Sequence, residues 1–306
     1  MTSHSARHTR RTHLRQLSLL GLSPLLSSWM NTDNAVLTRP IPSSGEQLPL
    51  VGLGTWQTFD VGNSPEARQP LGDVLKTLAQ KGGRMVDSSP MYGTSEEVVG
   101  DLSTALRLNA KLFIATKVWT TGKDSGIRQM NESFEKLGRK QVDLMQVHNL
   151  TDWQTHLPTL QDWKAEKKIR YIGITHYTES AYDRVEHILK TTPLDFLQIN
   201  YSILSRKAEE RLFPLALEKK VAVIINQPFE EGALFRQVKG KTLPDWAKEF
   251  DCGSWGQFFL KFILAHPAVN CVIPGTSKPH HMADNMGAAF GKLPDEKQRT
   301  KMLHLF

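Results

Sequence analysis

Short apolar segments alternate with longer amphipathic segments along residues 50–289, and this alternation constrains the fold more than any other feature. The apolar segments have the length of buried strands, and the segments between them have the spacing of helices that cover a sheet. Strands are expected at 50–54, 84–87, 111–116, 142–147, 171–174, 196–200, 222–225 and 270–273. Helices are expected at about 66–81, 94–107, 124–138, 154–167, 178–190, 207–219, 254–265 and 279–289.

Strands that are separated by helices of this length form a parallel sheet, because each helix returns the chain to the same edge. Eight such units within roughly 250 residues indicate a closed (β/α)8 TIM barrel of the α/β class. A doubly wound sheet is the second choice, and it is disfavoured because no G-x-G-x-x-G motif follows the first strand. The chain of 306 residues, with 40% hydrophobic and 23% charged residues, is long enough to bury such a core.

The first 35 residues differ in composition from the rest of the chain. A basic region, 7–15, precedes an apolar segment, 17–26, that is too short to span a bilayer. The pair Arg10-Arg11 within it resembles the twin-arginine signal of bacterial export of folded proteins. We therefore expect a signal peptide at 1–35, a linker at 36–46, a barrel domain at 47–306, and a periplasmic or exported protein that meets the export machinery. A disordered basic tail on a cytoplasmic protein is the alternative.

Charge and cysteine content exclude several classes of protein. The net charge is +7, of which +3 lies in residues 1–35, where four arginines face one aspartate, so that +4 is left for the body. This excess is too small to indicate nucleic-acid binding. Cys252 and Cys271 have no metal-ligand spacing, and we expect two buried thiols rather than a disulfide. We expect no metal site and no membrane span in the mature protein.

Polar side chains interrupt the ends of the predicted strands. Asp87, Lys117 and His148 end the second, third and fourth strands, and Tyr92 follows in the loop after Asp87. In a barrel, all the carboxyl ends of the strands meet on one face, where enzymes with this fold build their active sites. Each residue alone has a structural explanation. Asp87 could cap the start of the next helix, and His148 could form a hydrogen bond with a backbone carbonyl in the core. Their convergence on one face favours function.

These four residue types suit protonation of a carbonyl oxygen. A Tyr phenol has a pKa near 10, and a neighbouring Lys ammonium favours the phenolate and lowers that value. Asp87 can keep a buried Lys117 charged, and a neutral His148 can orient the carbonyl by hydrogen bonding. No strong nucleophile or metal cluster accompanies them. The missing part is a hydride, so a nicotinamide cofactor is implied.

From about residue 47 onward, the chain resembles the aldo-keto reductases, which are (β/α)8 barrels that use NAD(P)H without a metal. The matching motifs are Val51-Gly-Leu-Gly-Thr-Trp56, Val86-Asp-Ser-Ser-Pro-Met-Tyr-Gly93, Ala115-Thr-Lys117, Asp143-Leu-Met-Gln-Val-His148, Ile172-Gly-Ile-Thr175, Leu197-Gln-Ile-Asn-Tyr201 and Ile273-Pro-Gly-Thr-Ser-Lys278, with Asn285. The resemblance implies that Tyr92 is the general acid, that Lys117 and Asp87 tune it, and that His148 orients the substrate.

The same resemblance implies a set of cofactor-binding residues. They are Gly54, Thr55, Thr175, His176, Gln198, Asn226, Gly275, Thr276, Ser277, Lys278 and Asn285. Lys278 favours NADP(H), whereas NAD(H) stays possible because His281 stands where many members have Arg. His176 replaces the usual Asn, and Asn226 replaces an aromatic residue that often stacks on the nicotinamide; Phe229 is a candidate substitute for it.

Trp56, Trp119 and Asn149 are candidates for the substrate pocket, although the two tryptophans would also suit packing at the rim. Segment 230–245 is either a lid or an insertion without a catalytic part. We therefore expect a monomeric, NAD(P)H-dependent reductase of an aldehyde or ketone. The departures at His176 and Asn226 keep open a nicotinamide-binding sensor with little turnover. A barrel isomerase or lyase is a weaker alternative.

Overall fold

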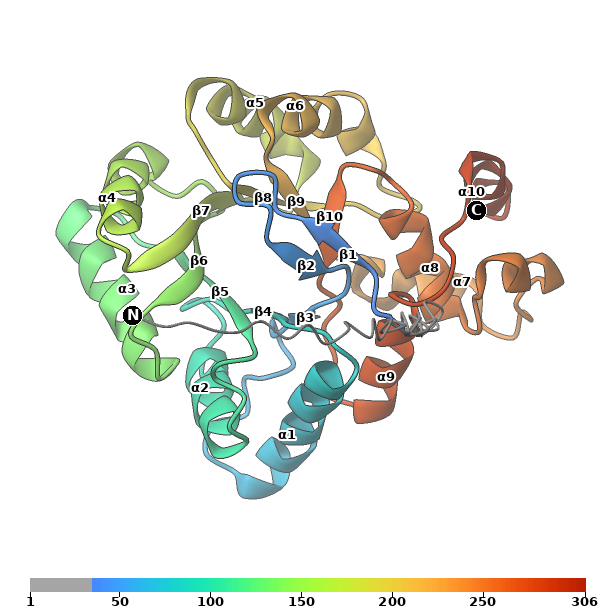
Figure 1. Cartoon of the computed structure of the whole chain (residues 1–306), viewed down its shortest axis with the longest axis horizontal. Helices are drawn as coiled ribbons and strands as arrows, with labels where there is room; N and C mark the ends of the chain where they lie inside the picture. Colours follow the sequence, from blue (N-terminus) through green and yellow to red (C-terminus); the bar gives the residue numbers. More distant parts are fainter. Residues whose placement is uncertain (1–34) are drawn as a thin grey trace, which may run out of the picture. The chain divides into compact units, whose positions relative to one another are not determined.

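The computed structural model describes residues 35–306, which form a barrel of eight parallel strands surrounded by helices (Figure 1). Neighbouring strands in the sheet follow the order of the chain, from β3 to β10. Their bounds are β3 Leu53–Gly54, β4 Met85–Asp87, β5 Phe113–Val118, β6 Val142–His148, β7 Ile169–Thr175, β8 Phe196–Asn200, β9 Ala222–Asn226 and β10 Val269–Val272. The alternation of segments in the sequence therefore predicted the strands to within a few residues.

The first and last strands close the barrel through backbone contacts. Val51 bridges to Val272, and Gly54 bridges to Gly275. Gly54 is required here because a Cβ atom at this position would lie only 2.8 Å from the carbonyl oxygen of Ile273. The closed sheet confirms the (β/α)8 barrel and rules out the doubly wound alternative.

Helices cover the outside of the barrel in the order in which they follow the strands (Figure 1). Their bounds are α1 Pro65–Gln80, α2 Ser95–Ala105, α3 Lys123–Lys136, α4 Trp153–Ala165, α5 Tyr182–Thr191, α6 Leu212–Lys219, α7 Ala233–Gln237, α8 Trp255–Leu264, α9 Pro279–Gly287 and α10 Glu296–Leu303. Helix α1 illustrates why they pack: Leu71, Val74, Leu75 and Leu78 recur at helical spacing and are all buried. This stripe faces the sheet and excludes water from it.

Side-chain alternation along the strands divides the barrel interior into an apolar part and a polar part. Along β5, Phe113, Ala115 and Lys117 share one face of the strand, because successive side chains point to opposite sides. Phe113 and Ala115 belong to an apolar cluster that also contains the Tyr171 and Phe196 rings. Lys117 therefore continues the inward face of β5 at the carboxyl end of the strand.

A β-hairpin occupies part of the segment that we predicted to be a linker, so the prediction for 36–46 was wrong in this respect. The antiparallel strands are β1 Thr38–Pro40 and β2 Gln47–Pro49. Ile41 and Leu48 are fully buried in the same cluster as Phe113, so the hairpin closes the amino-terminal end of the barrel (Figure 1). Prolines and glycine in this segment suggested a linker, but they form the turn and the edge of the hairpin.

Helix α10 was also absent from our predictions, although the sequence contains its start signal. Asp295 accepts a hydrogen bond from the backbone N–H of Gln298, whose side chain accepts one from the N–H of Asp295. This reciprocal capping box stabilises the first turn of a helix.

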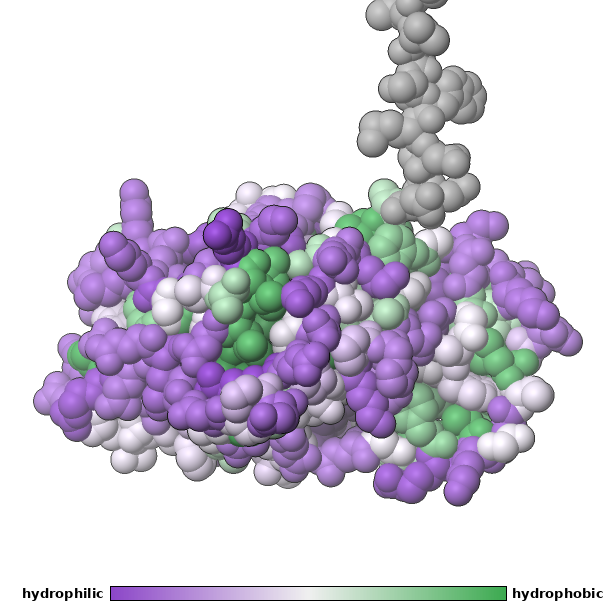
Figure 2. Space-filling view, turned by 90° about the horizontal axis from the view of Figure 1, so that it is seen from below, coloured by the Kyte–Doolittle hydropathy of each residue, from purple (hydrophilic) through white to green (hydrophobic). Residues whose placement is uncertain are grey.

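The surface and the cysteines have ordinary properties. The face shown in Figure 2 is mostly hydrophilic, with smaller hydrophobic patches. No helix within residues 35–306 is long and apolar enough to cross a bilayer. Cys252 and Cys271 are both buried and free, which confirms the prediction of two thiols.

Arg39 fastens the hairpin to the barrel, and its loss should destabilise the protein. Its guanidinium donates to the backbone carbonyls of His266 at 2.8 Å, Leu264 at 2.7 Å and Val269. Because Arg39→Ala removes the guanidinium donor from three partly buried carbonyls, we expect it to lower the free energy of unfolding by about 2–3 kcal/mol. Urea unfolding measures this change. Arg206→Ala, at an exposed arginine, is the control, and equal effects of the two variants would contradict the assignment.

Candidate active site

Asp87, Lys117 and His148 lie at the carboxyl ends of β4, β5 and β6, three neighbouring strands of the barrel. Tyr92 lies in the turn between β4 and α2, where its backbone N–H donates to the carbonyl of Ser89 at 3.0 Å. Its ring meets the ring of His148 edge-on, with centroids 5.6 Å apart. The structure therefore brings together the four side chains that the sequence placed at one face of the barrel.

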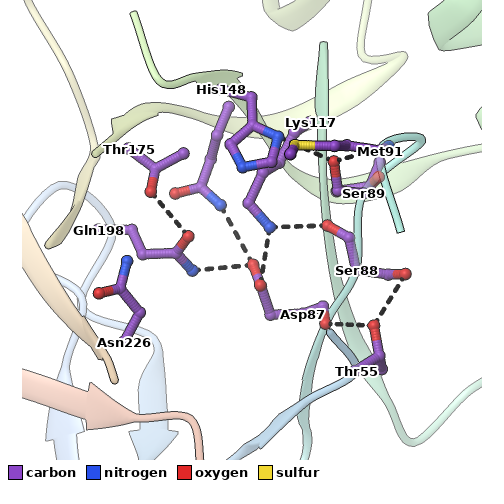
Figure 3. A network of polar contacts seen from close by, with 12 residues as sticks. Thr55, Asp87, Ser88, Ser89, Met91, Lys117, His148, Thr175, Gln198 and Asn226 are labelled. Carbon is purple, nitrogen blue, oxygen red and sulfur yellow. Dashed lines mark hydrogen bonds and ion pairs between the residues drawn. The ribbon is translucent and has the colours of Figure 1, made fainter. Parts of the chain in front are cut away.

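Lys117 and Asp87 form a buried ion pair at the centre of this group (Figure 3). The Lys117 ammonium donates to Asp87 Oδ2 at 2.7 Å and to the carbonyl of Ser88 at 2.8 Å. The side chain of Lys117 is 0% exposed, and that of Asp87 is 3% exposed. The other carboxylate oxygen, Oδ1, accepts from the amides of Gln198 at 2.9 Å and Gln146 at 3.4 Å. These donors compensate for the removal of the carboxylate from water.

The ammonium of Lys117 also faces the phenol, with Nζ lying 4.8 Å from the centroid of the Tyr92 ring. Burial on its own would lower the pKa of Lys117, but Asp87 and Tyr92 more than offset it, so that the pKa is raised and the ammonium is retained. Burial raises the pKa of Tyr92 above its ordinary value, and the charge of Lys117 offsets only part of that rise. The prediction gave the correct sign for the effect of Lys117, which does lower the pKa of Tyr92. The prediction of a lowered pKa overall was wrong, because burial raises the pKa by more.

His148 is a neutral imidazole in this environment. Burial lowers its pKa to about 2, and the positive charge of Lys117 acts in the same direction. Its Nδ1 lies 3.0 Å from the hydroxyl oxygen of Ser89. The ring of Trp119 is the next aromatic group, with its centroid 6.4 Å from that of His148.

A cavity of about 660 Å³ opens over these residues at the carboxyl ends of the strands. It is bordered by Asp87, Tyr92 and His148, whereas Lys117 lies buried behind them. Six of the predicted cofactor residues also border it, namely Gly54, Thr55, Thr175, Gln198, Asn226 and Gly275. The cavity therefore joins the proposed catalytic groups to much of the proposed cofactor site.

The polar groups of the cavity suit the carboxamide of a nicotinamide. Asn226 donates from Nδ2 to the carbonyl of His176 at 3.3 Å, while its buried Oδ1 has no hydrogen-bond partner within residues 35–306. A buried acceptor of this kind matches an amide N–H₂ donor. Thr175 and Gln198 are already engaged, because the Thr175 hydroxyl donates to Gln198 and Gln198 donates to Asp87 (Figure 3). They thus link the cofactor side of the cavity to the ion pair.

The ring of His176 lies beside the cavity and does not border it. Its Nδ1 accepts hydrogen bonds from the backbone N–H groups of Tyr177 at 3.0 Å and Thr178 at 3.2 Å. The imidazole ring stacks on the ring of Tyr177. Phe229 borders the cavity together with Asn226.

Thr276, Ser277 and Lys278 lie just before the amino terminus of α9, and Asn285 lies further along this helix; none of the four borders the cavity. Thr276 accepts the backbone N–H of Lys278 through its hydroxyl at 3.1 Å, which shapes the turn before the helix. Ser277 and Lys278 are exposed, and Asn285 is buried on α9. A helix amino terminus with an exposed lysine suits a phosphate group.

Two of the three substrate candidates, Trp56 and Asn149, border the cavity. Trp119 does not border it, although its ring is near that of His148. Both tryptophans are about 40% exposed, and Trp56 is the one of the two that lines the cavity. Segment 230–245 contains α7 and contributes Glu231, Gly232 and Phe235 to the wall of the cavity.

Two residues of the site were missed by sequence reasoning. Gln146 donates to Asp87, and Ser89 contacts His148. Gln146 could have been found, because it precedes His148 by two positions and therefore shares its face of β6. Ser89 gave no such signal, since a serine beside a proline is ordinary in a turn.

Comparison with known proteins identifies the family. The model of the aldo/keto reductase family matches residues 50–300. The chain therefore belongs to the aldo/keto reductase family.

Individual relatives are distant but extensive in coverage. Aldo-keto reductase str7 of Strobilurus tenacellus is 27% identical over 73% of this chain and 77% of its own length. The NADH-specific methylglyoxal reductase of Escherichia coli is 27% identical over 68% and 72%, respectively. Among solved structures, an aldo-keto reductase of Klebsiella pneumoniae in complex with NADPH superposes with a TM-score of 0.73 at 22% identity, covering 89% of this chain and 96% of that one.

The buried ion pair yields a prediction about stability. Lys117→Met removes the ammonium and leaves the Asp87 carboxylate buried without its counter-charge, so we expect a loss of about 3–5 kcal/mol in the free energy of unfolding. Lys248→Met, which breaks an exposed pair with Asp245, should cost no more than about 1 kcal/mol. Urea unfolding at neutral pH compares the two variants, and similar losses would contradict the importance of the buried pair.

Proposed function

We propose that the protein reduces an aldehyde or ketone to an alcohol with NAD(P)H. The observation that supports this most strongly is the geometry of Tyr92, which borders the cavity beside a neutral His148 and a buried, charged Lys117. This arrangement offers a proton and a hydrogen bond to one oxygen atom, as carbonyl reduction requires. Membership of the aldo/keto reductase family supports the same reaction.

In the proposed mechanism, His148 donates a hydrogen bond to the carbonyl oxygen and orients it beside Tyr92. A reduced nicotinamide, when bound, supplies the hydride to the carbonyl carbon. Tyr92 gives its phenolic proton to the oxygen, and the ammonium of Lys117 stabilises the phenolate that results. Asp87 keeps Lys117 charged in a site where water cannot. Lys117 therefore stabilises the anion as it forms, although it does not make the resting phenol unusually acidic.

We favour NADP(H) as the cofactor, with NAD(H) as the alternative. Lys278 supports the former by offering a positive charge beside the amino terminus of α9. His281 supports the latter, because burial lowers its pKa and keeps it neutral where a cation would favour a phosphate. Thr175, Gln198 and Asn226 would hold the nicotinamide end.

A nicotinamide-binding sensor with little turnover is the second candidate function. The observation that favours it is the side chain of Asn226, which offers no aromatic face to the nicotinamide and is tied to the backbone of His176. Retention of the cofactor without reduction of any carbonyl in a panel of aldehydes and ketones would support the sensor.

The reductase mechanism predicts that Tyr92→Phe lowers kcat about 10²–10⁴-fold, because the variant keeps the ring and loses the proton donor. Steady-state assays on a panel of aldehydes, together with fluorescence titration of NADPH, separate loss of chemistry from loss of binding. Tyr171→Phe is the matched control, because it also removes a phenolic hydroxyl, one that forms hydrogen bonds with Ser44 and Glu46. It should leave turnover close to that of the wild type. Undiminished turnover in Tyr92→Phe would exclude Tyr92 as the donor.

The pH profile of the wild-type enzyme extends this test. Tyr92 must be protonated to act, and its pKa is raised above the ordinary value of about 10, so kcat/KM should fall only as pH rises through that raised pKa. Burial and the charge of Lys117 lower the pKa of His148 to about 2, so its imidazole should stay neutral across the assay range and no step should occur near the ordinary value of about 6.5. Suppose that kcat/KM of the wild type declines as pH falls through about 6.5, and that this step is absent when His148 is replaced. That result would contradict a permanently neutral imidazole.

We further propose that the protein is a monomer exported to the periplasm by the twin-arginine route. The support for export is the sequence of residues 1–35, of which 1–34 lie outside the described part of the chain. Export of a folded protein would allow the cofactor to travel in its site.

The export proposal predicts that changing both Arg10 and Arg11 to Lys retains the full-length chain in the cytoplasm of a bacterium with this route. Changing both Arg7 and Arg15 to Lys conserves the same total charge and should leave export intact. Cell fractionation measures the outcome. Equal distribution of the two double variants would contradict a twin-arginine signal.

A further inference from the structure

Ser89 is a fully buried residue that contacts His148 and has no part in the mechanism described above. Its hydroxyl oxygen lies 3.0 Å from His148 Nδ1 and accepts the backbone N–H of Met91 at 3.2 Å. Figure 3 shows the serine between the Met91 turn and the imidazole. Ser89 thus connects the loop that holds Tyr92 to the ring of His148.

Counting protons determines the direction of the bond between Ser89 and His148. A serine hydroxyl has one proton to donate. Within residues 35–306, Nδ1 is the one acceptor that the Ser89 hydroxyl contacts, because its other contact, the N–H of Met91, is a donor. If Nδ1 carried the imidazole proton, the hydroxyl proton would be buried without an acceptor, which is costly. The hydroxyl therefore donates to Nδ1.

A neutral imidazole that accepts at Nδ1 carries its proton on Nε2. Within residues 35–306, the His148 ring forms its hydrogen bond through Nδ1, and His148 borders the cavity. In this tautomer, the ring presents an N–H donor to a carbonyl oxygen. In the other tautomer, a lone pair on Nε2 would face the lone pairs of that oxygen.

We propose that Ser89 is a positioning residue that holds His148 in the Nε2–H tautomer and so sets the donor for the substrate carbonyl. The catalytic consequence rests on the proposed reductase function, whereas the tautomer itself does not. The arrangement resembles the way in which a partner at one imidazole nitrogen fixes the role of the other.

Nitrogen NMR of the protein labelled at histidine tests the tautomer without cofactor or substrate. The wild-type His148 signals, assigned by comparison with His148→Gln, should show a protonated Nε2 and an acceptor Nδ1 from about pH 6 to 8. In Ser89→Ala, we expect a mixture of tautomers and a fall of about tenfold in kcat/KM. Ser89→Thr keeps a hydroxyl and should restore most of both properties. Ser103→Ala, at another buried serine, is the control for general loss of a hydroxyl.

The outcomes separate the two proposals. A wild-type spectrum with the proton on Nδ1 overturns the role of Ser89, and this result needs no folded variant of Ser89. An unchanged tautomer in Ser89→Ala overturns it as well, even if activity falls, because the loss would then come from displacement of the loop. If the wild type has the expected tautomer but reduces no carbonyl, the positioning of His148 stands and the reductase function fails.

Discussion

The ion pair between Lys117 and Asp87 is the interaction on which the rest of the site depends. Two charges that are removed from water are tolerated only when they neutralise each other and when the remaining oxygen and hydrogen atoms find partners. Here the carboxylate accepts from Gln198 and Gln146, and the ammonium donates to the carbonyl of Ser88. The pair therefore orders β4, β5, β6 and β8 around one point at the mouth of the barrel. It also keeps a positive charge next to Tyr92.

The barrel makes this pair possible by dividing its own interior. Phe113, Tyr171 and Phe196 fill the amino-terminal part with rings, and the hairpin of β1 and β2 closes that end. Water is thus excluded from the amino-terminal end of the barrel, while the cavity gives access at the carboxyl ends of the strands. The same burial raises the pKa of Tyr92 and lowers that of His148, so both groups are neutral at physiological pH. A neutral acid and a neutral hydrogen-bond donor are the forms that the proposed reaction needs.

Much of the fold and the centre of the site could be predicted from the sequence. Strand periodicity fixes which residues share a face, so Asp87, Lys117 and His148 could be placed together from their positions at strand ends. The hairpin could not be predicted in this way, because its proline-rich turn has the composition of a linker and its pairing is set by contacts with the distant residues of β10. The contact of Ser89 with His148 depends on side-chain geometry across 59 positions, which no local pattern encodes.

The balance of effects on Tyr92 was beyond sequence reasoning for a related reason. The sequence shows that a lysine and a tyrosine converge, and it gives the sign of their interaction. The competing effect of burial depends on how completely the folded chain covers the phenol, and no local pattern in the sequence gives that. Cofactor residues near α9 were predicted from family motifs, and their roles remain proposals.

The central claim, that the cavity performs reduction by hydride transfer, is tested most directly by following the hydrogen. NADPH deuterated at C4 of the dihydronicotinamide is supplied with an aldehyde that the protein converts, and the product is analysed by mass spectrometry. The account predicts that, with deuterium on one of the two faces of the dihydronicotinamide, each product molecule carries one deuterium on its carbinol carbon. If hydride transfer limits the rate, the reaction should also be slower than with unlabelled NADPH. Conversion that incorporates no deuterium from either face, or that proceeds without a nicotinamide, would contradict it and would favour an isomerase or lyase in the same barrel.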